Sequence, residues 1–529
     1  MKIGIQLLSE QKVLIQCSEF SQNSKNNILY TDNQTCDQLL PDYILSRLYK
    51  FQIEGVNYGL QKYGRILLAD EMGTGKTIQA LALSWCFKKV FPCLIIVPTS
   101  LKNIWKQQIG SWLREIQETE VQVISKKGQA IQKNVQILII SYELAANYSQ
   151  QLNEMKFKIA IADEAHYLKN PKSKRSESII PLLQKCKHVI LLTGTPAMNK
   201  PKDLYTMVSI LRPDIFQYFK DFGNRYCDPQ PSQWGQGMEY EGLTNSQELN
   251  FIMNKYFIVR RLKSEVLVYL PRKHREIKYI EPDQQYKQEI QQLLNQNKSI
   301  VQNLEELTQN PNVDIETKND QQGKYDQWSS FTKSYQLTGK AKIQSALKQI
   351  EIILKTQDKI IIFAYHVEVI NCISDFLNRN LIKYVKLDGS VDVKQRQTNV
   401  DLFQNDKRVQ VSLLSLKASA LGVTLTAASH IVFVELYWNP SIMIQAEDRA
   451  HRIGQQQEVT CTYLLCQDTL DSIMYKQIQK KMENIQQAID DQQFTVNEDQ
   501  IMADENINNQ AVSELRQQVQ RNQSGKDAD

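Results

Sequence analysis

The 529-residue sequence predicts an α/β protein with two lobes, each built on a parallel sheet. Short runs of Ile, Val and Leu alternate with helical patterns in two separate regions, as in parallel sheets covered by helices on both faces. A segment in which about a third of the residues are Gln or Asn separates these regions. The length also exceeds the roughly 250–300 residues at which a single core stops growing.

The first region accounts for the N-terminal half. Residues 1–40 predict a short appendage, with a hairpin formed by two apolar stretches around a polar turn. Residues 41–200 predict the first lobe, and residues 201–280 a helical insertion that completes it and ends in a basic stretch. The expected strands of the first lobe are residues 66–69, 93–97, 135–140, 158–162 and 188–192.

The second region follows a connector. Residues 281–340 are rich in Gln and Asn and lack strand-like runs, which predicts a helical or partly disordered connector. Residues 341–485 predict the second lobe, with a helix over 468–482, and residues 486–529 an acidic, disordered tail. The expected strands of the second lobe are residues 360–364, 384–387, 411–414, 430–436 and 459–465.

Composition and charge exclude several classes of protein. The net charge is +5, and because the tail carries about −6, the remainder carries about +11, which permits a polyanionic partner. No apolar run reaches the length of about 18 residues that a membrane span requires. The start of the chain lacks the apolar region of a signal peptide. Nine cysteines without a CxxC pair indicate a reducing compartment and argue against a zinc module.

A glycine-rich loop follows the first expected strand, in ILLADEMGTGKTIQ. Its glycines let backbone N–H groups approach phosphates, and the helix that follows adds a favourable dipole. We expect residues Gly73 to Thr77 to bind ATP. Lys76 would contact the β- and γ-phosphates, and the Thr77 hydroxyl would ligate Mg²⁺. The residues assigned to this loop are Gly73, Thr74, Gly75, Lys76 and Thr77.

Paired carboxylates end the strand of IAIADEAHYLKN. Hydrolysis of a phosphoanhydride needs one carboxylate for Mg²⁺, here Asp163, and a second group that orients and deprotonates water, here Glu164. A solvated turn or helix cap is the alternative, and the loop about 90 residues upstream favours the site. His166 would couple the nucleotide state to the TGTP turn with Thr193 and Thr195, which is otherwise an ordinary turn.

The second region contributes two arginines in QAEDRAHRIGQ, residues 445–455. Arg449 and Arg452 would share a helix face and reach a γ-phosphate, a role worth about 10³–10⁵ in rate. A solvated basic helix end is the alternative. Gln445 and Asp448 would be their polar partners. Upstream, the amide of Gln52 could recognise the adenine edge with one donor and one acceptor. Because the chain is rich in Gln, a Gln at this position could also occur by chance.

Taken in order, FQxxGV, DEMGTGKT, DEAH, TGTP and QAEDRAHRIGQ resemble the motifs of Swi/Snf-type ATPases of helicase superfamily two, over residues 41 to about 485. Asp70 replaces the first glycine of the strict loop pattern, as in helicase-like loops. The stretches at 194–207, 222–228 with Trp234 and Gly235, and 434–440 are similar to the annealing-helicase, HARP-like subgroup. The chain departs from that subgroup at Thr74, in the short residues 1–40, and in lacking a zinc finger or nuclease motif after residue 485.

This resemblance implies two tandem RecA-like lobes and an ATP-driven translocase on double-stranded or forked DNA, located in the nucleus and active in replication-fork remodelling and repair. It implies partners among single-strand DNA-binding or replication proteins. It also implies DNA contacts that track phosphates without reading sequence. Loop polarity is the alternative for most of these residues, and a core position for Trp438. They are Thr99, Ser100, Lys102, Ser415, Lys417, Gly422 and Trp438.

Two other functions compete with an annealing helicase. A nucleosome remodeller would share the motor, but this chain leaves no room for bromo-, chromo- or SANT-like modules. A non-catalytic DNA-binding scaffold would share the fold, but the residues expected to hydrolyse ATP are all present.

Overall fold

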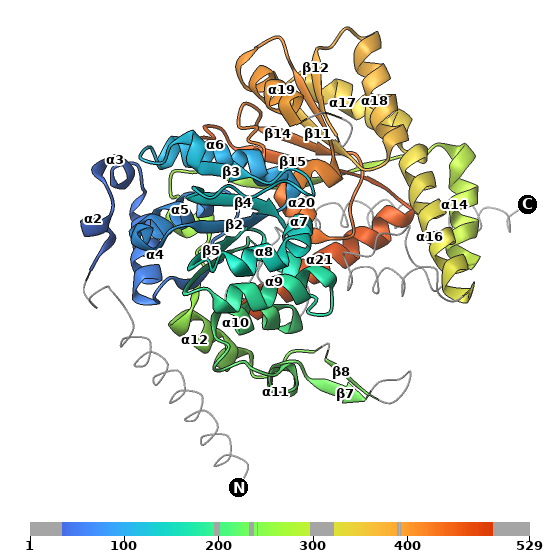
Figure 1. Cartoon of the computed structure of the whole chain (residues 1–529). Coiled ribbons are helices and arrows are strands. Elements are labelled where there is room, and N and C mark those ends of the chain that lie inside the picture. Colours follow the sequence, from blue (N-terminus) through green and yellow to red (C-terminus); the bar gives the residue numbers. More distant parts are fainter. Residues whose placement is uncertain are drawn as a thin grey trace, which may run out of the picture.

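Two parallel sheets organise the fold (Figure 1). The computed structural model describes residues 34–194, 201–231, 237–240, 242–296, 322–388, 391 and 393–489. The first sheet has the strand order β3-β4-β2-β5-β6-β1-β9, and the second the order β10-β15-β14-β11-β13-β12. Every pairing within these two sheets is parallel, which confirms the predicted α/β class.

The strands of the first sheet are buried on both faces, which explains their nearly continuous apolar sequences. The five expected strands are present, with ends that shift by at most two residues. The expected set omitted β3 and β9, which are only three and two residues long. The strands are β1 (Arg65–Leu68), β2 (Cys93–Val97), β3 (Val121–Val123), β4 (Ile137–Ser141), β5 (Ile159–Ala162), β6 (His188–Leu192) and β9 (Ile258–Val259).

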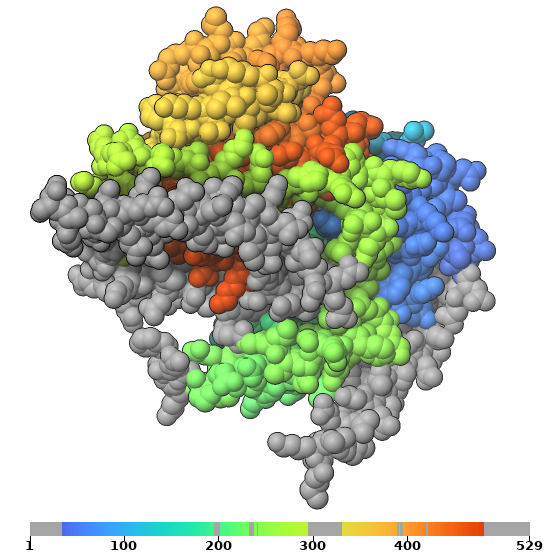
Figure 2. Space-filling view, turned by 180° about the vertical axis from the view of Figure 1, so that it is seen from behind, coloured from blue at the N-terminus to red at the C-terminus, as the bar shows by residue number. Residues whose placement is uncertain are grey.

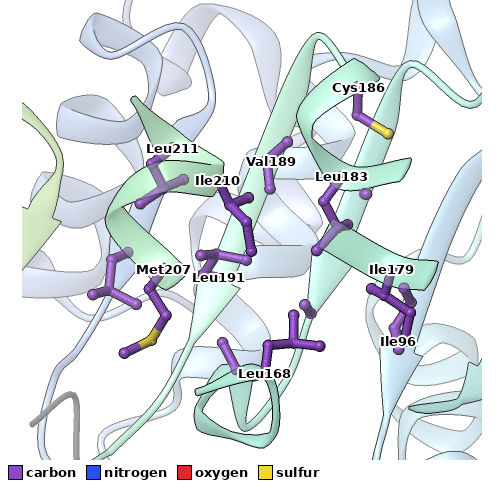
Figure 3. Close-up of a cluster of buried hydrophobic side chains, with 14 of the residues drawn as sticks. Ile96, Leu168, Ile179, Leu183, Cys186, Val189, Leu191, Met207, Ile210 and Leu211 are labelled. Atoms are coloured by element: carbon purple, nitrogen blue, oxygen red, sulfur yellow. The ribbon is translucent and has the colours of Figure 1, made fainter. Parts of the chain in front are cut away.

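Helices cover both faces of the first sheet because alternate strand residues point to opposite faces. One buried cluster joins the sheet to α2 (Cys36–Leu39), α3 (Asp42–Leu45), α4 (Lys50–Gln61), α5 (Lys76–Cys86) and α6 (Lys102–Trp112). The other joins it to α7 (Tyr142–Asn147), α8 (Ser149–Glu154), α9 (Lys174–Lys185) and α10 (Tyr205–Leu211). Figure 3 shows Val189 and Leu191 of β6 close to Leu183 of α9 and Ile210 of α10.

The segment after residue 200 contains several helices and adds a hairpin that projects from the lobe (Figure 1). The hairpin strands β7 (Pro229–Pro231) and β8 (Met238–Tyr240) are antiparallel. The remaining elements are α11 (Phe219–Tyr226), α12 (Ser246–Tyr256) and α13 (Lys263–Val266).

The strand β10 (Lys273–Ile280) belongs to the second lobe, which corrects the predicted boundary at residue 280. It pairs with β15 along its whole length. Because β10 is an edge strand with partly exposed residues, its sequence KHREIKYI lacks the apolar run that marks the central strands. The chain therefore crosses between the lobes over residues 264–272, a route visible from behind as the light green segment in Figure 2.

The second sheet is covered in the same way. One buried cluster joins it to α17 (Ile343–Leu354) and α18 (Val367–Arg379), and the other to α16 (Gln322–Ala341), α19 (Val393–Asn405), α20 (Pro440–Glu447) and α21 (Leu470–Ile489). The five expected strands are again present. They are β11 (Ile360–Ala364), β12 (Tyr384–Leu387), β13 (Val411–Ser415), β14 (His430–Phe433) and β15 (Val459–Cys466).

The described part of the connector forms α14 (Gln284–Gln296) and α16, which pack on each other and on the second lobe. Phe331 and Tyr335 of α16 are buried in the core of that lobe. The expected N-terminal hairpin and the tail from residue 490 lie outside the described residues. Of the helices described, none combines the length and apolar character that a bilayer span requires.

Candidate active site between the two lobes

The glycine-rich loop joins β1 to α5 and adopts a conformation that favours glycine. Gly73 and Gly75 have φ angles of 83° and 86°. Residues with a Cβ atom adopt such positive φ angles only with backbone strain. A Cβ atom at Gly75 would also lie 2.5 Å from Nε2 of Gln52. Lys76 and Thr77 open α5 directly after Gly75. The loop therefore presents backbone N–H groups and a helix N-terminus, the arrangement that binds phosphate.

The ammonium of Lys76 lies inside this loop and close to several carboxylates. It donates hydrogen bonds to the carbonyl oxygens of Asp70 at 2.7 Å and Glu71 at 3.2 Å. Burial lowers the pKa of Lys76, and the negative charges of Glu164, Asp70, Asp163 and Asp448 oppose that shift. Asp448 belongs to the second lobe, so the field at Lys76 comes from both lobes.

Gln52 anchors α4 to the loop. Its Nε2 donates to the carbonyl oxygen of Thr74 at 2.9 Å, and its Oε1 accepts from the backbone N–H of Tyr49 at 3.0 Å. One donor and the carbonyl oxygen of the amide are therefore engaged by the protein. Recognition of adenine by Gln52 stays a prediction.

Asp163 and Glu164 lie at the end of β5 in different surroundings. Asp163 accepts hydrogen bonds from Nε1 of Trp105 at 2.8 Å and from the backbone N–H of Glu164 at 2.9 Å. Burial and the adjacent carboxylate of Glu164 raise the pKa of Asp163. Burial would also raise the pKa of Glu164, but His166, Lys76 and Arg449 outweigh it and lower that pKa. Two adjacent carboxylates with opposite shifts suit two different roles.

His166 links this carboxylate pair to the end of β6. Its Nδ1 lies 3.2 Å from Oε2 of Glu164 and 3.4 Å from Oγ1 of Thr193. The backbone N–H of Thr193 donates to the carbonyl oxygen of Leu68 on β1 at 3.2 Å. Coupling through His166 and Thr193 stays a prediction, and Thr195 lies outside the described residues.

The two arginines of the second lobe face this site. A Cβ atom at Gly73 would lie 2.8 Å from Cβ of Arg452, so Arg452 packs directly on the loop. Burial and Arg452 lower the pKa of Arg449 to about 10, while the charges of Asp448 and Glu164 oppose the shift. Nε of Arg449 donates to the carbonyl oxygen of Gln445 at 3.1 Å. The structure thus brings together the loop, the carboxylates and both arginines.

Sequence reasoning missed several residues that hold the site. Asp70 is fully buried and accepts hydrogen bonds from Nε of Arg261 at 2.9 Å, from its Nη2 at 2.6 Å, and from Nε2 of Gln79 at 2.9 Å. Asp448 pairs with Lys263 at 2.7 Å. The one local signal for these contacts was the Asp at position 70 in place of glycine. A buried carboxylate there requires a positively charged or hydrogen-bonding partner.

The expected DNA contacts fall into two groups. Gly422, with φ 72°, packs on the other lobe, since its Cβ would lie 2.6 Å from Cδ2 of Leu101. The stretch Thr99–Leu101 and the turn Leu416–Leu421 thus lie side by side. Four of the expected DNA contacts lie near this junction. They are Thr99, Ser100, Ser415 at the end of β13, and the exposed Lys417. The hydroxyl of Thr99 donates a hydrogen bond to Glu143.

Two expected DNA contacts point elsewhere. Nζ of Lys102 donates to the carbonyl oxygen of Ile124 at 3.0 Å inside the first lobe, so this position does not favour phosphate binding. Trp438 is only 3% exposed and packs among aromatic rings, which makes it a core residue rather than a groove residue. Its ring centroid lies 4.1, 5.6, 5.8 and 6.4 Å from those of Tyr437, Tyr365, Tyr335 and Phe331.

Comparison with protein families and known proteins agrees with this arrangement. The family described as SNF2-related domain matches residues 51–327, and the one described as helicase conserved C-terminal domain matches residues 342–454. The chain is 36% identical over 446 residues to the Xenopus laevis SWI/SNF-related matrix-associated actin-dependent regulator of chromatin subfamily A-like protein 1. It is 34% identical over 452 residues to the human DNA annealing helicase and endonuclease ZRANB3.

These alignments cover 84% of this chain but only 44% of the Xenopus protein and 40% of the human protein, so the chain spans less than half of either relative. Among solved structures, the Sulfolobus solfataricus SWI2/SNF2 ATPase core in complex with dsDNA aligns over 85% of this chain and 99% of that chain, with 24% identity and a TM-score of 0.40. The sheet topology, rather than this alignment, carries the fold assignment.

Proposed function

The chain belongs to the SNF2-related family, and on that premise we propose that it is an ATP-dependent translocase on double-stranded DNA that anneals forked or branched DNA. One observation supports the proposal above the others. The arginines Arg449 and Arg452 of the second lobe face the phosphate-binding loop and the carboxylate pair of the first lobe. A site divided in this way can hydrolyse ATP only when the lobes are closed.

The residues of the first lobe would bind ATP and position the attacking water. The loop and Lys76 would hold the phosphates, with the ammonium exchanging its carbonyl partners for phosphate oxygens. Glu164 has a lowered pKa and is the carboxylate available to orient and deprotonate water. Its distance of 3.2 Å from His166 supports a link between hydrolysis and the end of β6.

The donor set of this site fits a magnesium ion held by Thr77 and Asp163. The raised pKa of Asp163 indicates a buried carboxylate that lacks sufficient positive charge around it, which a divalent cation would supply. When bound, Mg²⁺ neutralises charge on the β- and γ-phosphates. Arg449 and Arg452 would stabilise the charge that develops on the transferred phosphoryl group.

Lobe closure would convert this chemistry into movement along DNA. The contact of Gly422 with Leu101 lies beside the residues expected to track phosphates, so opening and closing would change their spacing. Phosphate contacts carry no sequence information, which suits stepping along any duplex. Re-pairing DNA is favourable by about 1.4 kcal/mol per base-pair step, so ATP would supply direction rather than duplex stability.

The finer parts of this proposal rest on the relatives. One relative is named a DNA annealing helicase, and this similarity favours forked DNA as the substrate. A nuclear location, a role in replication-fork remodelling and repair, and recruitment by single-strand DNA-binding or replication proteins belong to the same proposal.

The experiment measures ATPase rates with no DNA, single-stranded DNA, duplex DNA, forked DNA and nucleosomes. We expect strong stimulation by duplex and forked DNA. Lys76→Ala and Glu164→Gln should each abolish turnover, while Lys355→Met should keep it, because Lys355 forms an exposed ion pair with Glu351 and is not among the residues assigned to the site. DNA-independent turnover would contradict the proposal. A preference for nucleosomes would indicate a remodeller, and DNA binding without hydrolysis a scaffold.

A further inference from the structure

The segment after β9 follows the start of the phosphate-binding loop residue by residue. The backbone N–H of Ala69 donates to the carbonyl oxygen of Val259 at 2.7 Å, and that of Glu71 to Arg261 at 3.0 Å. The backbone N–H of Lys263 then donates to Oε2 of Glu71 at 2.8 Å. The pairing of β1 with β9 therefore continues past both strands, and it carries Lys263 to the loop.

The side chain of Lys263 crosses from this position into the second lobe. Its Nζ lies 2.7 Å from Oδ1 of Asp448 and donates to the carbonyl oxygen of His451 at 2.8 Å. The same Nζ lies 4.0 Å from Oε1 of Glu71. Lys263 is only 3% exposed, so solvent screens these contacts little. One buried ammonium thus contacts the beginning of the loop and the turn that carries Arg449 and Arg452.

A second lysine fixes Asp448 from its own lobe. Nζ of Lys273, at the start of β10, lies 3.4 Å from Oδ1 of Asp448 and 2.8 Å from Oε2 of Glu447. Burial alone would raise the pKa of Asp448, but Lys263 and Lys273 outweigh it and lower that pKa. The two lysines stand at the two ends of the crossing at residues 264–272, so Asp448 joins both ends of the link between the lobes.

We propose that Lys263 is a positioning residue for ATP hydrolysis, which holds the turn at residues 448–452 against the phosphate-binding loop when the lobes close. Lys273 keeps Asp448 in place within the second lobe, whereas Lys263 makes its contact across the lobes. Arg452 packs on Gly73 from the same turn. Loss of Lys263 should therefore displace the arginines without removing any group that touches the nucleotide. This inference rests on the proposed ATPase activity.

The test is a double-mutant cycle on turnover with duplex DNA. Lys263→Met should lower kcat by about tenfold or more, since a buried partner is lost, while KM for ATP changes by less than about threefold. Arg452→Ala should lower kcat further. In the Arg452→Ala background, Lys263→Met should lower kcat by less than about a further twofold. A residue that acts by positioning the arginines has little effect once Arg452 is already absent.

Two further variants keep the inference falsifiable. Lys263→Gln retains a donor for the carbonyl oxygen of His451 but carries no charge, so it serves if Lys263→Met does not fold, and it should also lower kcat. Lys355→Met is the matched control, because it removes an exposed lysine from an ion pair and should leave kcat unchanged. A thermal unfolding curve of each variant separates lost turnover from lost fold.

The outcomes distinguish this inference from the proposed function. The inference is overturned and the proposed function stands if the wild type shows DNA-stimulated turnover and both Lys263→Met and Lys263→Gln keep it. The same conclusion follows if the loss of kcat in the double variant equals the product of the losses in the two single variants. If the wild type hydrolyses no ATP, the proposed function is overturned. The role of Lys263 in hydrolysis is then overturned as well, and small-angle scattering tests only the contact between the lobes, since a larger radius of gyration for Lys263→Met supports that contact and an unchanged radius contradicts it.

Discussion

The buried ion pair between Asp70 and Arg261 offers a test whose size follows from the structure. Asp70 is fully buried, and Arg261 supplies two of the three hydrogen bonds that its carboxylate accepts from side chains. Arg261→Met keeps an apolar stem of similar length but leaves the carboxylate with only the amide of Gln79. Because removing one partner of a buried pair leaves an uncompensated charge, we expect a loss of about 3–5 kcal/mol in the free energy of unfolding.

The second half of this test removes both partners. In Asp70→Ala with Arg261→Met neither charge of the pair remains, so the double variant should recover about 2–3 kcal/mol relative to the sum of the single losses. The assay is urea unfolding followed by circular dichroism. Arg408→Met is the matched control, since Arg408 binds Asp406 with the same forked geometry at an exposed position, and its loss should leave stability unchanged. A loss below about 1 kcal/mol for Arg261→Met, or strict additivity, would refute the reasoning.

Three further predictions concern stability. The wild type should lose about 1–3 kcal/mol of stability as pH rises through the raised pKa of Asp163, about 6, and Asp163→Asn should remove this pH dependence; the same pH profile in both proteins, measured without nucleotide or metal, would contradict this. Glu447→Gln should cost about 3–5 kcal/mol, because Glu447 is buried with a lowered pKa and binds Arg275 through two hydrogen bonds. The stability that Glu447 supplies should disappear as pH falls below its ordinary pKa, and a flat acid limb of the stability profile would argue against it. Trp438→Ala should lower the free energy of unfolding by about 3–5 kcal/mol, whereas Trp438→Phe should keep the affinity for duplex DNA. Weaker duplex binding by a stable Trp438→Phe variant would show that Trp438 contacts DNA.

The central strands were predictable because burial on both faces leaves a plain signature. The run CLIIV became β2 and HVILL became β6, with unchanged ends. The edge strand β10 carries charged residues on its partly exposed faces and looks like a loop in the sequence. The burial of Trp438 was hard to predict for a related reason, because two of the four aromatic rings around it come from α16, about a hundred positions upstream.

The residues of the candidate site also differ in how far the sequence predicts them. The loop residues, the carboxylate pair and the arginines each carry a local pattern, so their roles could be expected before their positions were known. The supporting contacts carry none, since Arg261 and Asp70 are 191 positions apart and Lys263 meets His451 from 188 positions away. Such pairs follow from the fold, which brings β9 beside β1 and the turn at residues 448–452 beside the phosphate-binding loop.

A single-turnover measurement of Arg452→Ala with duplex DNA tests most directly whether the two lobes share one active site. The variant should bind ATP as the wild type does, because its loop and Lys76 are intact, and it should hydrolyse the bound ATP about 10³-fold or more slowly. Hydrolysis at the wild-type rate would contradict an active site completed by the second lobe.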